Sequence, residues 1–69
     1  MKELSFKKLG KNIKTARKSV GMTQQELSNG CAINEQIIGF IERGQKKPSL
    51  ELMYKISVIL GTTIDKLIG

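Results

Sequence analysis

The sequence predicts an all-α fold of five short helices, with residues 1–69 forming one domain. The first observation is that a Ser, Thr or Asn residue precedes each of five apolar stretches, which is the usual signal of a helix start. The second is that apolar residues recur three and four apart within these stretches, as they do along one face of a helix. The third is that glycine or proline follows the stretches, where helices stop.

The central stretch of the chain runs from Thr23 to Gly44 and predicts two helices joined by a tight turn, at about residues 23–43. Thr23 and Glu26 form the T-x-x-E pattern of a capping box, which starts the first of them. Gly30 is expected to end that helix. Asn34 is expected to cap the second helix, and Gly44 stands where a left-handed stop is expected.

The second of these helices has two different faces. Its inward face carries Ile38 and Ile41, with Ile37 at the edge. Its outward face carries Glu35, Gln36, Gly39, Phe40 and Arg43. Gln can pair with adenine, Glu can accept from cytosine and an aromatic ring can touch a thymine methyl group. Glu35, Gln36 and Phe40 are therefore the predicted base contacts.

The remaining helices follow the same logic. Ser5 is expected to cap the first helix after a loose start at Met1 to Leu4, with Leu4 and Leu9 as a hydrophobic staple. The core positions predicted in the first helix are Phe6, Leu9, Ile13, Ala16 and Val20. In the fourth helix, capped by Ser49, they are Leu50, Met53, Ile56 and Leu60. Thr63 is expected to cap a last short helix that holds Ile64, Leu67 and Ile68.

These elements resemble the Cro-type, or xenobiotic-response-element, family of phage-repressor helix-turn-helix proteins. The match runs in register from Leu9 to Ile68 and takes in Leu9-Gly10, Arg17-Lys18, Gly21-Met22-Thr23-Gln24, Glu26-Leu27, Ile38, Ile41-Glu42-Arg43-Gly44, Pro48-Ser49-Leu50, Leu60-Gly61 and Asp65-Lys66-Leu67. The resemblance implies a lambda-repressor-like domain of five helices that binds duplex DNA and usually represses or tunes transcription. It also implies that Gln24 clamps the DNA backbone and that Arg17 pairs with Glu42.

One position departs from the family pattern. The family usually has glycine in the turn, where the backbone is left-handed, but this chain has Ala32 there and glycine two residues earlier, at Gly30. Either Ala32 tolerates strain of about 1 kcal/mol, or the turn is rebuilt around Gly30.

The chain carries a net charge of +6, and the excess lies in residues 1–20. A basic domain attracts polyanions over long range. The lysines of the first helix could contact flanking phosphate, steer association or form a solvated face. The predicted phosphate contacts are Gln24, Arg43, Lys46 and Lys47. Gln24 follows from the resemblance, and the other three lie in or beside the polar loop after the helix that carries the predicted base contacts.

Enzyme chemistry is not expected. The chain has no His, and its one Cys cannot form a disulfide within the chain or a structural zinc site. No metal, cofactor or small-molecule ligand is therefore predicted. There is no signal peptide and no apolar run near the ~20 residues that span a membrane, so the expected location is the cytoplasm, on nucleoid DNA.

The sequence as a whole predicts a double-stranded DNA-binding transcriptional regulator, of the repressor type, that binds a pseudo-palindromic operator as a homodimer. Apolar residues beyond the needs of a small core are the dimer candidates: Tyr54, Val58, Ile64 and Ile68. The alternative is a protein-interaction module on the same scaffold, such as an antitoxin-like partner protein. A third alternative is that the first helix, which is basic and amphipathic, lies on an anionic membrane. Phage repressor, restriction-modification controller and antitoxin partner all stay open.

Overall fold

The computed structural model describes residues 4–69, so the expectation of a loose start at residues 1–3 lies outside the described chain. Within residues 4–69 there are five helices and no strands: α1 (Phe6–Ser19), α2 (Gln24–Cys31), α3 (Glu35–Glu42), α4 (Leu50–Leu60) and α5 (Ile64–Ile68). The predicted all-α fold class is confirmed.

Each helix begins at the residue that the sequence predicts, because a side-chain oxygen there accepts a hydrogen bond from a backbone N–H of the first turn. These caps are Ser5, Thr23, Asn34, Ser49 and Thr63, with donor–acceptor distances of 2.8–3.2 Å. At α2 the capping box is complete, since the Thr23 N–H also donates to Glu26 Oε1 at 2.9 Å.

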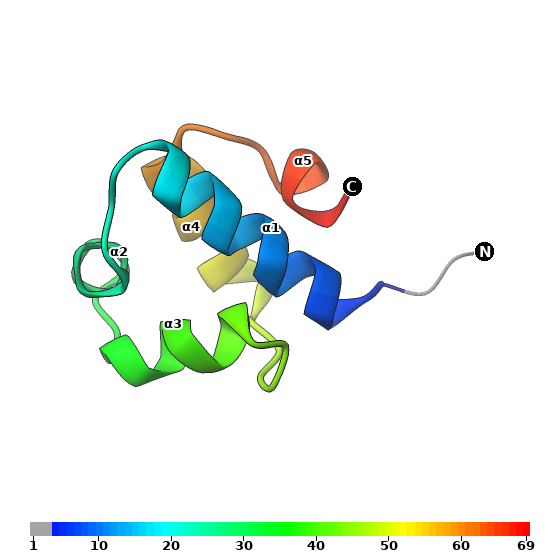
Figure 1. Cartoon of the computed structure of the whole chain (residues 1–69), viewed down its shortest axis with the longest axis horizontal. Helices are drawn as coiled ribbons and strands as arrows, with labels where there is room; N and C mark the ends of the chain where they lie inside the picture. Colours follow the sequence, from blue (N-terminus) through cyan, green and yellow to red (C-terminus); the bar gives the residue numbers. More distant parts are fainter. Residues whose placement is uncertain (1–3) are drawn as a thin grey trace.

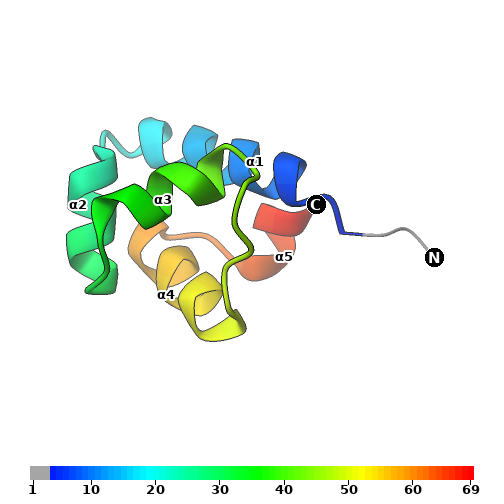
Figure 2. The ribbon, with the colours of Figure 1, turned by 90° about the horizontal axis from the view of Figure 1, so that it is seen from below.

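The helices pack around a single core. Both views show α2 and α5 on opposite sides of the molecule, with α1, α3 and α4 between them (Figures 1 and 2). α1 contacts α3, α4 and α5, while α2 packs on α3 and α4. The buried apolar side chains are Leu9, Ile13, Leu27, Cys31, Ile38, Ile41, Met53, Ile56, Leu60 and Leu67.

Two predicted core positions are wrong. Val20 is 51% exposed and Leu50 is 76% exposed. Val20 follows the last turn of α1 and Leu50 is the first residue of α4, so both lie at helix ends. An apolar stripe continues to the end of a helix whether or not another helix covers it there, and spacing alone cannot tell the two cases apart. Phe6 and Ala16, also predicted inside, are partly buried against the core.

The prediction that Gly30 ends the helix is also wrong, because α2 continues to Cys31 and the left-handed residue is Ala32, with φ 57° and ψ 42°. Gly30 instead permits a close approach between α2 and α4. A Cβ atom at Gly30 would lie 2.9 Å from Cδ1 of Ile59. The turn is closed by a hydrogen bond from the Ile33 N–H to the Ser28 carbonyl, at 3.0 Å.

The left-handed Ala32 leads to a stability prediction. Ala32→Gly should raise the free energy of unfolding by about 1 kcal/mol, because glycine lacks the Cβ that makes this conformation unfavourable. In a domain of this size the thermal midpoint should rise by about 4–8 °C. Ala16→Gly is the matched control. Because Ala16 lies inside α1, this change should lower the free energy of unfolding by about 1 kcal/mol. Equal losses in both variants would contradict the prediction.

Candidate nucleic-acid interface

A shallow surface hollow of about 380 Å³ lies over α3, and we call it the α3 hollow. Its lining residues are Gln24, Glu35, Gln36, Gly39, Phe40 and Arg43. The three predicted base-contact residues therefore share one surface. Asn34 caps α3, because its side-chain oxygen accepts a hydrogen bond from the Gln36 N–H at 2.8 Å. This bond stabilises the first turn of α3, which carries Glu35 and Gln36.

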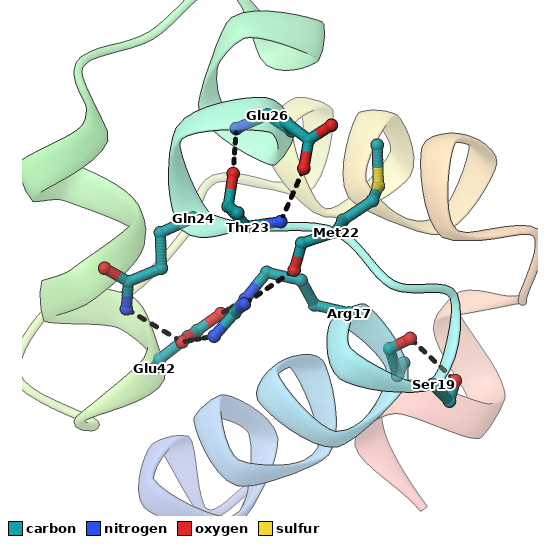
Figure 3. A network of polar contacts seen from close by, with 8 residues as sticks. Arg17, Ser19, Met22, Thr23, Gln24, Glu26 and Glu42 are labelled. Atoms are coloured by element: carbon teal, nitrogen blue, oxygen red, sulfur yellow. Dashed lines mark hydrogen bonds and ion pairs between the residues drawn. The ribbon is translucent and has the colours of Figure 1, made fainter.

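A buried ion pair joins α1 to the end of α3, close to Gln24 at the edge of the α3 hollow (Figure 3). Arg17 Nε donates to Glu42 Oε2 at 2.7 Å, and Arg17 Nη2 donates to Oε1 at 3.0 Å, so the pair is bidentate. Arg17 Nη1 donates to the Met22 carbonyl at 2.8 Å. The hydrogen bond to Glu42 raises the pKa of Arg17, which stays charged. One side chain thus ties α1 to the end of α3 and to the segment before α2.

Gln24 belongs to the same network. Its Nε2 donates to Glu42 Oε1 at 3.0 Å, and its side-chain oxygen points away from that carboxylate (Figure 3). Gln24 was predicted as a phosphate contact from the family resemblance. The structure adds that the side chain is already held by Glu42 at the edge of the α3 hollow.

Arg43 lies differently from Lys46 and Lys47, which are also predicted phosphate contacts. Its guanidinium carbon is 5.1 Å from the centroid of the Phe40 ring, and its Nε donates to Gln45 Oε1 at 3.1 Å. It lines the α3 hollow, whereas Lys46 and Lys47 do not. The structure therefore groups Arg43 with the predicted base contacts.

The loop that carries Lys46 and Lys47 comes back to the start of α1. A Cβ atom at Gly44 would lie 2.8 Å from the Cα of Lys7, and Lys47 Nζ is 5.0 Å from the centroid of the Phe6 ring. Exposed lysines from two distant parts of the sequence thus meet at one edge of the molecule. The sequence does not predict this grouping, because no local pattern links Lys7 to residues 44–47.

The predicted dimer residues are only partly brought together. Tyr54, Val58 and Ile64 line one shallow hollow of about 310 Å³ between α4 and α5. Ile68 lines a neighbouring apolar groove, in which Leu50 and Phe6 also lie and which shares Ile64 with the first hollow. Tyr54 and Val58 are exposed, but Ile64 packs partly against the core.

Three further features concern the thiol of Cys31, metal binding and membrane spanning. Cys31 is buried, and burial raises the pKa of its thiol, which disfavours the reactive thiolate. Within residues 4–69, no three side chains of His, Cys, Asp or Glu gather as they would around a metal ion. In the same part of the chain, every helix is too short or too polar to cross a membrane.

Comparison with known proteins identifies the family and supports the fold. Residues 13–67 match the model of the helix-turn-helix family HTH_3. An HTH-type transcriptional regulator of Archaeoglobus fulgidus is 38% identical over 55 residues, which cover 80% of this chain and 79% of that protein. The restriction-modification controller protein C.AhdI of Aeromonas hydrophila superposes with a TM-score of 0.86 at 26% identity, over 90% of this chain and 94% of C.AhdI.

The biofilm regulator SinR, solved in complex with DNA, superposes with a TM-score of 0.83 at 27% identity, over 88% of this chain and 98% of SinR. The family and these relatives are transcriptional regulators rather than enzymes, as the sequence predicts. The chain therefore belongs to the Cro/C1-type helix-turn-helix family of DNA-binding transcriptional regulators.

Proposed function

We propose that the protein is a repressor that binds a pseudo-palindromic operator in double-stranded DNA as a homodimer. In this proposal α2 docks on the DNA backbone and α3 enters the major groove. The observation that carries it is the α3 hollow, which collects an amide, a carboxylate and an aromatic ring on one exposed surface. A dimer bound across its operator represses by excluding other proteins from that DNA, and this needs no small-molecule effector.

Three side chains read bases in this arrangement. Gln36 pairs with adenine, Glu35 accepts a hydrogen bond from cytosine, and Phe40 contacts a thymine methyl group. All three are exposed and lie on one face of α3. The buried pair of Arg17 and Glu42 supports them by fixing the position of α3 against α1.

Phosphate contacts flank the reading face. Gln24 donates its second Nε2–H to a phosphate from the first turn of α2, where the N-terminal end of the helix also attracts anions. Lys46 and Lys47 contact the next stretch of backbone from the loop after α3, together with Lys7. These contacts fix the register of the protein on DNA without selecting a sequence.

Dimerisation follows from the small size of one reading surface. One α3 covers only a few base pairs, so a second copy supplies the rest of the contact, with the two helices about 34 Å apart. The exposed side chains of Tyr54 and Val58, beside Ile64, are the proposed two-fold contact. Ile68 lies outside this hollow and contributes only if the contact extends beyond it.

Selection from a random pool of duplex DNA tests the reading face. The wild-type protein should select one consensus, with binding that weakens steeply as salt rises. Gln36→Ala should cost about 1–3 kcal/mol on that site and relax the choice at one base pair. Lys46→Ala is the control: it should weaken all sequences alike and reduce the salt slope by about 1. An unchanged consensus for Gln36→Ala contradicts this assignment of the face, and salt-independent or absent DNA binding favours a protein-interaction module.

Sedimentation of the complex tests the dimer. The wild-type protein should form a complex of two chains per selected operator. Val58→Asp should reduce binding to the full operator more than binding to a half-site, because it places a charge in the contact. Val20→Asp is the matched control, since Val20 is also exposed and lies outside that hollow. Val58 is preferable to Ile64 for this test because Ile64 also packs against the core. A single chain on the full operator would refute the dimer.

A further inference from the structure

The Arg43 side chain lies against three neighbours, Gly39, Phe40 and Gln45. Arg43 is the C-cap residue of α3, directly after Glu42. Its side chain folds back toward the preceding turn, as helix geometry favours. Its guanidinium stacks at 5.1 Å from the Phe40 ring, and its Nε–H donates to Gln45. A Cβ atom at Gly39 would lie 3.2 Å from Nη1 of Arg43, so the glycine leaves the guanidinium room to lie close to the helix. Little side-chain entropy remains to be lost when this group binds.

The free end of Arg43 points to a specific ligand chemistry. Among residues 4–69, no acceptor binds Nη1 or Nη2, while Nε is already occupied by Gln45. Two parallel N–H donors from a planar guanidinium match a pair of acceptors side by side. In the major groove guanine offers such a pair, O6 and N7.

The surroundings of Arg43 favour a base over a phosphate as that ligand. Arg43 shares the α3 hollow with Gln24 as well as with Glu35 and Gln36, whereas Lys46 and Lys47 lie outside it. Unlike Gln24, Arg43 stacks on the ring of Phe40, a predicted base contact. Glu35 suits cytosine and Gln36 suits adenine. Arg43 adds the pair of N–H donors that guanine recognition requires. We propose that Arg43, stacked on Phe40, is a specificity-determining residue that reads one guanine through Nη1 and Nη2. The proposal rests on the proposed function and replaces the phosphate role predicted for Arg43 from the sequence.

The test compares Arg43→Lys with the wild-type protein by selection from the same random DNA pool. Lysine keeps the charge but loses the planar fork and the stacking. Arg43→Lys should weaken the choice of guanine at one position with a nearly unchanged salt slope, since lysine can still donate to O6 or N7. Arg43→Met donates no hydrogen bond and should lose that choice by about 5- to 140-fold. Phe40→Leu should weaken the same preference partly, because Arg43 is no longer held by the ring.

Modified DNA identifies the atoms involved. Replacing that guanine by 7-deazaguanine removes N7, so it should weaken wild-type binding and leave Arg43→Met unaffected. Inosine keeps O6 and N7 and should be tolerated by both proteins. Lys46→Ala, by contrast, should keep the guanine preference while binding all DNA more weakly.

The outcomes separate this inference from the proposed function. If the wild-type protein selects no consensus, both fall. If it selects a consensus that Arg43→Met keeps unchanged, or if 7-deazaguanine is tolerated at every guanine of the site, only the role of Arg43 is overturned. A reduced salt slope for Arg43→Ala with an unchanged consensus would return Arg43 to the phosphate contacts.

Discussion

Glu42→Ala should lower the free energy of unfolding by about 3–5 kcal/mol, because it leaves the Arg17 guanidinium buried without its counter-ion. The Glu42 side chain is 1% exposed and that of Arg17 is 8% exposed, so water cannot replace the lost carboxylate. Gln24 loses its acceptor in the same variant. Urea denaturation followed by circular dichroism measures the change.

A surface pair gives the matched control for this experiment. Lys55 and Glu51 lie 3.4 Å apart on α4, with side chains 45% and 81% exposed. Glu51→Ala should change stability by less than about 1 kcal/mol, because exposed pairs are solvated and screened. Replacing both buried partners, as in Arg17→Met with Glu42→Leu, should be much less harmful than either single change. A coupling energy near zero in the double-mutant cycle would refute the pairing as a source of stability.

Gly10→Ala should destabilise the fold by about 3 kcal/mol, near the upper end of what one added methyl group does in a packed core. Gly10 is buried where α1 meets the end of α3. A Cβ atom there would lie 2.2 Å from the Ile41 carbonyl oxygen and 2.7 Å from that of Glu42. Backbone cannot rotate out of the way as a side chain does, so α3 has to shift.

Gly30→Ala is the control for Gly10→Ala. Both glycines lie in helices, where alanine is preferred by about 1 kcal/mol. At Gly30 the new methyl group meets only the end of the Ile59 side chain, which can rotate. Gly30→Ala should therefore be neutral or slightly stabilising in the same urea titration, and equal losses at the two sites would contradict the argument from backbone contact. DNA binding by Gly10→Ala should fall further than its loss of folded protein explains, because the displaced end of α3 carries Arg43.

The reading surface was predictable in part. Periodicity places Gln36 and Phe40 on the outer face of α3, because one strongly apolar face of that helix has to meet the core. The Arg17–Glu42 pair was expected only from the family resemblance, since a link across 25 residues leaves no local pattern. The position of Arg43 over Phe40 was not predicted. A side chain at the end of a helix can extend into the loop or fold back, and contacts with Gly39 and Gln45 decide between these.

The sequence by itself determined where the helices begin, since each cap bonds to a backbone N–H only two or three residues away. Such chemistry is local and needs no other part of the chain. Only the tertiary structure decided that Ala32 takes the left-handed turn while Gly30 stays helical, and that Val20 and Leu50 stay outside the core. These outcomes depend on what lies opposite each residue: Ile59 of α4 lies opposite Gly30, whereas Val20 and Leu50 remain exposed. Strain of about 1 kcal/mol at one residue is small beside the apolar surface that the packed helices bury together.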